Sequence, residues 1–148
     1  MRIEDLMSRE VKTVEEGRSA GEAWELMRRH RIRHLVVLRE GGVAGVISDR
    51  DLGGPRGAAL REGKTVADLM APHVVSAGPS TTVRQAANLL RGHVVGCLPV
   101  LDGPRVVGIV TTSDLLDLLG RGVERPVPKA TRWTLRHRGR GRKRMRRG

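Results

Sequence analysis

One eight-residue segment that occurs twice decides the fold of this chain. Residues 45–52 read GVISDRDL, and residues 108–115 read GIVTTSDL, at a constant offset of 63 positions. The same offset aligns residues 3–52 with residues 66–115 without a gap. Because self-similarity at a fixed period indicates one supersecondary unit used twice, the sequence predicts an internal pseudo-dimer. Two copies are too few for a solenoid.

Each copy is expected to open with a short helical turn, at Ile3–Met7 in the first copy and at residues 66–70 in the second. The segments SAGE (19–22) and TVRQ (82–85) both have the pattern of a capping box, in which a hydroxyl stands three residues before Glu or Gln. The apolar residues that follow recur at helical spacing. A helix is therefore predicted behind each box.

Strands are predicted on both sides of these helices. Short strands are expected at residues 11–14 and 74–77, and apolar runs within residues 35–47 and 98–110 predict two hairpins. In the first hairpin, the glycines assigned to the turn, in preference to a phosphate-binding loop, are Gly41, Gly42 and Gly45. After each hairpin a hydroxyl residue ends the strand and a final helix is expected. Pairing the copies about a pseudo-twofold axis would create two equivalent clefts.

Composition and charge limit the class of protein. The chain has 148 residues, no Phe or Tyr and a single cysteine, Cys97, so the core must be aliphatic and no disulfide framework is expected. No apolar run approaches the length of a signal peptide or a membrane span. These features predict a cytoplasmic protein that does not enter a membrane.

The net charge of +12 is concentrated at the C-terminal end. Residues 129–148 contain 10 Lys and Arg and no Asp or Glu. Such a self-repelling segment is expected to be disordered, and its Arg-Gly spacing is typical of segments that bind RNA or DNA phosphates. An acidic protein partner, or no dedicated partner at all, are the alternatives. The residues predicted to contact phosphates are Arg136, Arg138, Arg140, Arg142, Lys143, Arg144, Arg146 and Arg147.

The duplicated segments together resemble a tandem pair of cystathionine-β-synthase (CBS) domains, the Bateman module. The resemblance covers about residues 3–119 and rests on the repeated DLM, GVISDRDL and GIVTTSDL motifs and on GCLPV at 96–100. It implies an α/β fold of two tandem CBS repeats (β-α-β-β-α units) related by a pseudo-twofold axis, with a disordered basic C-terminal tail. We expect the first repeat and its linker at 1–58, the second repeat at 59–122 and the tail at 123–148.

The resemblance also implies that an adenosyl ligand binds in the clefts between the repeats. Asp51 and Asp114 would accept hydrogen bonds from ribose hydroxyls, and Ser48 and Thr111 would contact ribose or phosphate beside free amide groups. Arg50 is placed to hold a phosphate in the first site. The other residues predicted at the ligand are Thr13, Arg33, Leu35, Ser76, Gly96, Leu98 and Pro99.

The two copies differ at one corner of these expected clefts. The family's Gly-x-x-Pro pattern is present as Gly96 and Pro99, whereas residues 33–36 of the first copy read RHLV. Arg33 either crowds its cleft or holds a phosphate. We expect the second site, to which we assign Asp114 and the intact corner, to bind ligand more tightly.

Plainer interpretations stand beside these assignments. Each Ser/Thr-x-x-Asp segment also fits a helix cap, a role compatible with ribose binding. His30 and His34 have the spacing of zinc ligands on a helix, but no carboxylate or cysteine completes a set, so no metal is expected. Cys97 is interpreted as a packed small residue. No catalytic triad or paired carboxylates are present, so an enzyme is not expected.

The predicted function is a stand-alone CBS-pair regulatory protein that binds AMP, ADP, ATP or S-adenosylmethionine and needs no obligatory cofactor. The alternative is a nucleic-acid-associated protein that uses the basic tail, with the CBS pair as a structural dimerisation scaffold. A homodimer is predicted because several helix positions are apolar without an evident internal partner. These positions are Ala23, Trp24, Met27, Leu115, Leu116, Leu118 and Leu119.

Overall fold

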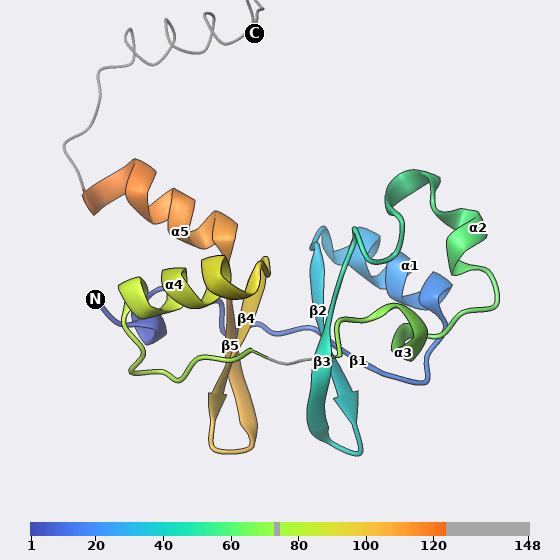
Figure 1. The fold of residues 1–148 in the computed structure, drawn as a ribbon, viewed down its shortest axis with the longest axis horizontal. Coiled ribbons are helices and arrows are strands. Elements are labelled where there is room, and N and C mark those ends of the chain that lie inside the picture. The colour runs from blue at the N-terminus through green and yellow to red at the C-terminus, as the bar shows by residue number, and fades with distance from the viewer. Residues whose placement is uncertain (73–74, 124–148) are drawn as a thin grey trace, which may run out of the picture. The chain divides into compact units, whose positions relative to one another are not determined.

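The computed structural model describes residues 1–72 and 75–123, which form two duplicated αβ halves (Figure 1). The chain divides into two units, residues 1–115 and residues 116–148. The first unit contains both repeats, and the described part of the second is the end of α5 with η3. In chain order the elements are η1 (Ile3–Asp5), β1 (Thr13–Glu15), α1 (Ala20–His30), β2 (His34–Arg39), β3 (Gly42–Ser48), η2 (Gly54–Arg56), α2 (Ala58–Arg61), α3 (Val66–Leu69), α4 (Val83–His93), β4 (Cys97–Asp102), β5 (Arg105–Thr111), α5 (Thr112–Leu118) and the π-helical turn η3 (Leu119–Val123).

The capped helices predicted from the sequence are confirmed. At the start of α1, the Glu22 amide donates to Ser19 Oγ (3.1 Å) and the Ser19 amide donates to Glu22 Oε1 (3.3 Å). Thr82 and Gln85 make the same reciprocal pair at the start of α4, at 3.1 and 2.9 Å. Both boxes satisfy amides that a helix end leaves without an internal partner, which fixes where each helix begins.

The two hairpins are also confirmed, and they are nearly identical. β2 pairs with β3 and β4 pairs with β5, both antiparallel, and each pair shifts register at the same point, between Val37 and Leu38 or between Val100 and Leu101. The turn assignment of Gly45 is wrong, because Gly45 lies inside β3 opposite Val37.

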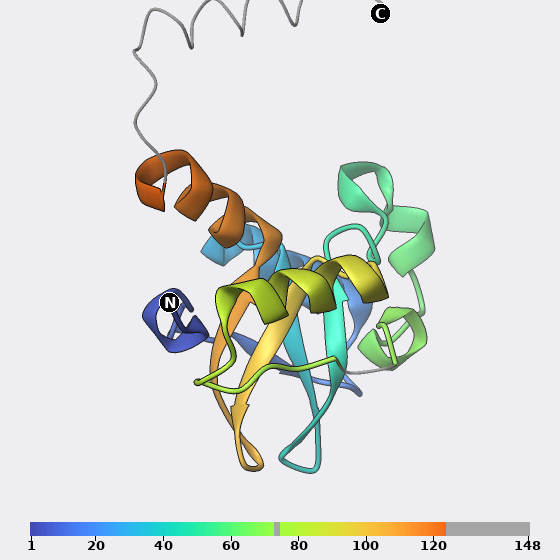
Figure 2. The same cartoon turned by 60° about the vertical axis from the view of Figure 1, so that its left-hand side comes forward.

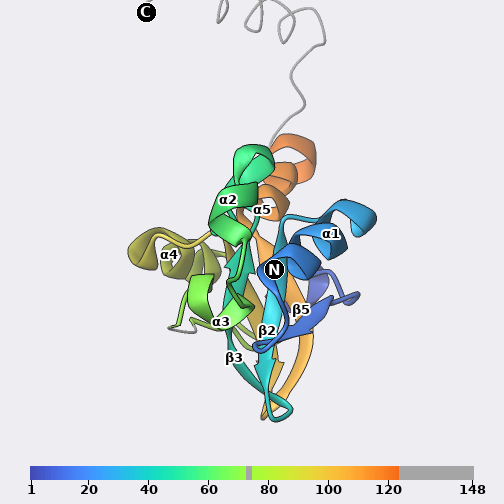
Figure 3. The ribbon, with the colours of Figure 1, turned by 90° about the vertical axis from the view of Figure 1, so that its right-hand side faces the viewer.

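The third strand distinguishes the repeats. β1 pairs in parallel with β2 and completes a three-stranded sheet, although it is shorter and starts later than predicted (Figure 3). In the second repeat the strand predicted at 74–77 is reduced, within the described residues, to one parallel bridge between Ala77 and Val100. Gly78 and Pro79 follow at once, and proline cannot donate a further ladder hydrogen bond.

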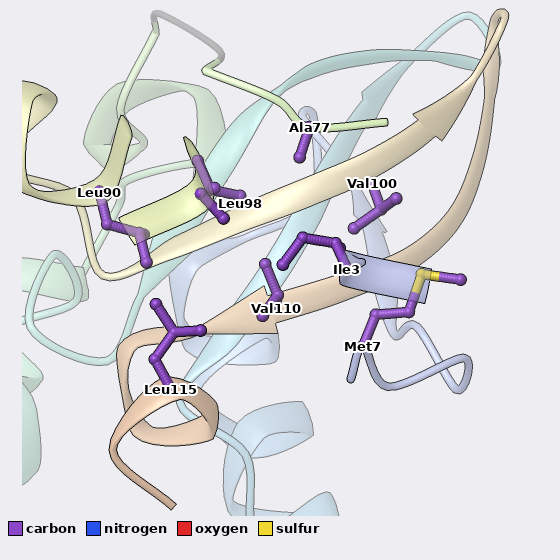
Figure 4. Close-up of a cluster of buried hydrophobic side chains, with 9 residues drawn as sticks. Ile3, Met7, Ala77, Leu90, Leu98, Val100, Val110 and Leu115 are labelled. Carbon is purple, nitrogen blue, oxygen red and sulfur yellow. The ribbon is translucent and has the colours of Figure 1, made fainter. Parts of the chain in front are cut away.

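The N-terminal turns of the two repeats are exchanged. η1 belongs to the first repeat in sequence but packs in the hydrophobic core of the second, where Ile3 is fully buried beside Val100 and Val110 (Figure 4). Its backbone is held there by the Ile3 amide, which donates to the Thr81 carbonyl (2.8 Å). The turn is a 3-10 helix over Ile3–Asp5, which is shorter than predicted.

The converse exchange places α3 in the core of the first repeat. Val66 is fully buried there with Val14 and Ile47, and its amide donates to the Arg18 carbonyl (2.8 Å). Each hydrophobic core is therefore completed by a segment of the other repeat, and the two repeats make one folded unit.

The glycine shared by both signature motifs allows this exchange. A Cβ at Gly45 would overlap the carbonyl oxygen of Ala71, which bridges to Val46, and a Cβ at Gly108 would overlap Met7. A side chain at Gly45 would push the incoming backbone off the sheet. One at Gly108 would displace the Met7 side chain and crowd the Ser8 carbonyl oxygen, 3.0 Å away. Close approach of the incoming segment, and not turn geometry, therefore favours glycine at these two positions.

The predicted final helix forms in only one repeat. α5 continues directly from β5 (Figure 2), whereas the first repeat has a turn at 49–53 followed by η2 and α2. Gly53 has φ +89° and Pro55 follows it, so the chain cannot continue as one helix. The guanidinium of Arg61 instead donates to the carbonyls of Leu52 and Gly54, both at 2.8 Å.

Candidate functional site

Two cavities lie between the repeats and are equivalent at an offset of 63 residues. The first, named the Asp51 cavity, has a volume of ≈ 420 Å³, and the second, named the Asp114 cavity, ≈ 370 Å³. The Asp51 cavity is defined by Ser48, Arg50, Asp51, Val95, Gly96 and Cys97. The Asp114 cavity is defined by the six equivalent positions, Thr111, Ser113, Asp114, Ile32, Arg33 and His34. Volumes of this size are at the lower end of those that hold small organic ligands.

Each cavity combines the segment from the hydroxyl residue to the aspartate of one repeat, its aspartate corner, with the residues at which β2 or β4 of the other repeat begins. Asp51 therefore shares its cavity with Gly96, and Asp114 shares its cavity with Arg33. This arrangement corrects the expected pairing of Asp114 with the intact Gly-x-x-Pro corner. The pseudo-twofold axis causes the crossing, because it places the strand start of each repeat opposite the aspartate of its partner repeat.

Both aspartate corners are closed by reciprocal hydrogen bonds. The Ser48 amide donates to Asp51 Oδ2 (2.9 Å) and the Asp51 amide donates to Ser48 Oγ (3.0 Å). Thr111 and Asp114 repeat this pair at 2.8 and 3.2 Å. The capping interpretation is confirmed at Thr111 and Asp114, where α5 begins, whereas the same bonds of Ser48 and Asp51 close a turn. Both pairs use only Oδ2, and within the described part of the chain no side chain or amide donates to Oδ1 of either aspartate.

Two of the amides expected to face a phosphate already donate to backbone carbonyls. The Asp49 amide donates to the Arg33 carbonyl (2.9 Å), and the Thr112 amide donates to the Gly96 carbonyl (3.0 Å). These bonds continue the hairpin ladders and tie each strand start to the corner of its own repeat. They also bring Arg33 beside the Asp51 cavity, whose lining it joins.

Five of the predicted ligand residues lie outside both cavities. Leu35, Leu98 and Pro99 are fully buried in the hydrophobic interior. Thr13 lines a separate groove beside α1, and Ser76 is half-buried away from the two cavities. The structure therefore brings together the aspartate corners, Arg33, Arg50 and Gly96, but not the predicted adenine contacts.

His34 and Cys97 are equivalent cavity residues that the sequence reasoning did not assign to the ligand. A Cβ at Gly96 would lie 3.1 Å from His34 Nε2, so the imidazole occupies the space that this glycine leaves. Burial lowers the pKa of His34, an effect that Arg33 reinforces and Asp49 and Asp51 oppose. The imidazole is therefore neutral at pH 7. A signal that could have indicated His34 is its position directly after Arg33, the equivalent of the predicted ligand residue Gly96 at an offset of 63.

The equivalent thiol is protonated at neutral pH. Burial, reinforced by the charge of Asp51, raises the pKa of Cys97 to about 12. A thiol in that state is a poor nucleophile and a poor metal ligand, so Cys97 contributes a small apolar surface to its cavity. This agrees with its interpretation as a packed residue.

The linings of the two cavities differ in charge. Arg31, the C-cap residue of α1, lines the Asp114 cavity. Its equivalent, Val94, is the C-cap residue of α4 and lines the Asp51 cavity. Lys12 also lines the Asp114 cavity and lies 4.0 Å from Glu10. The Asp51 cavity instead has Arg50 where the other has Ser113.

The described residues lack the arrangements that two other classes of site require. Within residues 1–72 and 75–123, no cluster of three His, Cys, Asp or Glu side chains has the arrangement needed to hold a metal ion. No helix in these ranges is both long enough and apolar enough to cross a bilayer. The predicted phosphate-binding residues of the tail, from Arg136 to Arg147, lie outside the described residues.

Comparisons with known proteins agree with this architecture. YhcV, a CBS domain-containing protein of Bacillus subtilis, is 32% identical over 114 residues, which cover 76% of this chain and 81% of YhcV. A solved structure of the CBS domain pair of protein MJ0100, in complex with 5′-methylthioadenosine and S-adenosyl-L-methionine, superposes with a TM-score of 0.74 at 30% identity, and covers 81% of this chain and 96% of that one.

A longer relative has a different name. A homoserine O-acetyltransferase of Methanocorpusculum labreanum is 33% identical over 119 residues, which are 80% of this chain but only 24% of that enzyme. The sequence profile of the CBS domain matches residues 3–52 and 66–121. These are the two repeats that form the two cavities, and the chain therefore belongs to the CBS-domain family, as a tandem CBS pair.

Proposed function

We propose that this protein is a regulatory CBS pair that binds an adenosyl ligand in the Asp51 and Asp114 cavities. The observation that carries the proposal is the pair of equivalent carboxylates. Each is held rigidly through Oδ2 by its own helix or turn, and each keeps Oδ1 for two vicinal hydroxyl donors such as those of a ribose. The complex of the MJ0100 CBS pair with two adenosyl molecules supports this choice of ligand class.

The volumes of the cavities, ≈ 420 and ≈ 370 Å³, favour a small ligand. AMP, ADP, ATP, S-adenosylmethionine and 5′-methylthioadenosine share the adenosyl group, and they differ in charge and length. With no Phe or Tyr in the chain, affinity would rest on hydrogen bonds, phosphate contacts and aliphatic packing. Arg50 and Arg33 are the groups that would contact a phosphate, because both line the cavity that contains Asp51, the carboxylate proposed to bind the ribose.

Thermal shift and calorimetry test the proposal with these five ligands. A ligand at a hundredfold over its dissociation constant is expected to add about 2.7 kcal/mol of stability. The Asp51→Asn/Asp114→Asn double variant keeps a cap acceptor and removes both charges, so it should fold and lose this stabilisation. The proposal fails if none of the five ligands shifts the wild-type transition, or if the double variant binds them as the wild type does.

We also propose that the protein acts as a homodimer. Leu116 and Leu119 expose 63% and 53% of their surface, although both are large and apolar. Apolar side chains that a short helix leaves in water are a frequent basis for symmetric association. Light scattering should return the mass of a dimer at micromolar concentration, and Leu116→Glu should return that of a monomer. A wild-type monomer mass would exclude this proposal.

A further inference from the structure

The last residue before β2 and the first residue of β2 line both cavities. Arg33 and His34 belong to the lining of the Asp114 cavity and also to that of the Asp51 cavity. Their equivalents, Gly96 and Cys97, line only the Asp51 cavity. The pseudo-twofold symmetry is therefore broken at this corner, and one guanidinium stands where a symmetric pair would have two or none.

Among the described residues that line both cavities, Arg33 is the only one with a permanent charge. Thr111 and Ser113 also line both cavities but are neutral, and His34 is neutral at pH 7 because burial lowers its pKa. The Arg33 side chain is exposed and makes no salt bridge within the described residues, so its head group is free to turn toward either cavity. Its backbone is fixed, since its carbonyl accepts from the Asp49 amide (2.9 Å).

The Arg33 guanidinium changes the net charge of the lining of either cavity. Without Arg33, the Asp51 cavity has two carboxylates, Asp49 and Asp51, against the single cation Arg50. Without Arg33, the Asp114 cavity has as many carboxylates as cations, with Lys12 beside Glu10. Neither lining then has a net positive charge. The Arg33 guanidinium, which can hold a phosphate through two parallel hydrogen bonds, adds one positive charge to whichever cavity it faces.

Building on the proposed function, we propose that the two cavities compete for Arg33, so that a phosphorylated adenosyl ligand in one cavity weakens the binding of a second in the other. The first ligand draws the guanidinium to its phosphate. The second then enters a cavity that is neutral or negative. An adenosyl ligand without phosphate makes no demand on Arg33, and two such ligands bind independently.

Isothermal titration with AMP and with 5′-methylthioadenosine tests this coupling. Asp51→Asn and Asp114→Asn each leave one working cavity and give the intrinsic dissociation constants, from which the isotherm for independent sites follows. For AMP, the second binding step of the wild type should be about fivefold weaker than that isotherm predicts. For 5′-methylthioadenosine, the wild type should follow it.

Two substitutions of Arg33 separate sharing from direct repulsion between ligands. Arg33→Gly restores the symmetry with Gly96, and it should weaken AMP in both cavities and abolish the coupling. Arg33→Lys keeps one movable charge and should retain part of it. The inference is overturned if AMP binds the wild type independently, if the coupling persists in Arg33→Gly, or if 5′-methylthioadenosine is coupled as strongly as AMP. Absence of binding by both ligands would instead overturn the proposed function.

Discussion

The two repeats agree where they are buried and differ where their hairpins begin and end. Their hairpins share one register, including the position of its shift, and their long helices share one type of cap. The first repeat has a third strand and a broken helix, whereas the second has a continuous α5 and only a bridge in place of that strand. The cores and the aspartate corners have kept the symmetry of the duplication, whereas the residues before β2 and β4, Arg33 and Gly96, have lost it.

The largest expected change in stability comes from a substitution in one of the exchanged turns. Ile3→Ala removes a fully buried side chain from the core of the second repeat and should cost about 2–5 kcal/mol of stability. Urea unfolding should be followed by circular dichroism and by Trp24 fluorescence in a Trp133→Phe background. Both signals should shift together, because the exchange couples the repeats.

The exposed Glu4 of the same turn provides the control. Glu4→Ala should change stability by less than about 0.5 kcal/mol. If Ile3→Ala lowers the urea midpoint measured by circular dichroism but leaves the midpoint measured by Trp24 fluorescence unchanged, the two repeats unfold separately.

The next largest change in stability is expected from loss of the Arg61 hydrogen bonds in the first repeat. The buried Arg61 bonds two carbonyls next to Asp51 and lies 4.2 Å from the centroid of the Trp24 ring. Arg61→Met should cost about 1.5–3 kcal/mol, as expected for hydrogen bonds from a charged donor. It should also weaken adenosyl binding in the Asp114→Asn background and leave the Asp51→Asn background unchanged.

Arg56, which is exposed in the neighbouring η2, gives the matched control. Arg56→Met should leave both stability and binding as they are. Equal weakening of the two cavities by Arg61→Met would mean that Arg61 supports the whole fold and does not position the Asp51 corner in particular.

A smaller effect, of the opposite sign, is expected at the helix ends. Arg31 and Val94 both adopt left-handed backbone conformations, with φ of 55° and 53°. A left-handed conformation costs a non-glycine residue about 1–2 kcal/mol, and Val94 is 89% exposed, so its side chain gains little from burial. Val94→Gly should therefore raise the free energy of unfolding by about 0.5–1 kcal/mol.

Arg31→Gly is the comparison in the other repeat. It should stabilise less, because a β-branched residue is the more strained of the two in this conformation. Denaturant midpoints at constant slope measure both changes. Destabilisation by Val94→Gly would contradict the strain argument.

The smallest effect is a pH dependence confined to the first repeat. Because burial lowers the pKa of His34, the unfolded chain takes up this proton at higher pH than the folded chain does. Stability should fall as the pH drops below about 6.5, the usual value for histidine. Melting temperatures between pH 7.5 and 5 should show a shallower fall in His34→Gln than in the wild type. The exposed His30 serves as control, and an unchanged slope in His34→Gln would contradict the assignment.

The sequence allowed the helices, the hairpins and the family to be predicted, because these depend on local signals. Capping boxes and apolar periodicity act within a few residues, and the 63-residue offset made each signal count twice. The exchange of the N-terminal turns could not be predicted, since a buried Ile3 has the same pattern in either core. Gly45 of the first signature motif carried part of that information, but it was assigned to the hairpin turn.

The candidate site was predicted in part for the same reason. Asp51 and Asp114 were assigned from the resemblance to CBS pairs, and Arg33 from its departure from the Gly-x-x-Pro pattern, and all three line a cavity. Leu35 and Leu98 were misplaced, because an apolar residue in a buried strand has one appearance whether it faces a core or a ligand. The pairing of corners across the repeats depends on the symmetry axis, which no stretch of one repeat specifies.

The exchanged turns have a consequence for how the chain folds. Ile3 contacts residues around Val100, and Val66 contacts residues around Val14, so each core closes a loop that spans much of the molecule. Such contacts raise the contact order and slow folding, since loop entropy is lost before packing compensates for it. A chain cleaved between Gly53 and Gly57 should yield two fragments that are each unstable alone and that recombine when mixed.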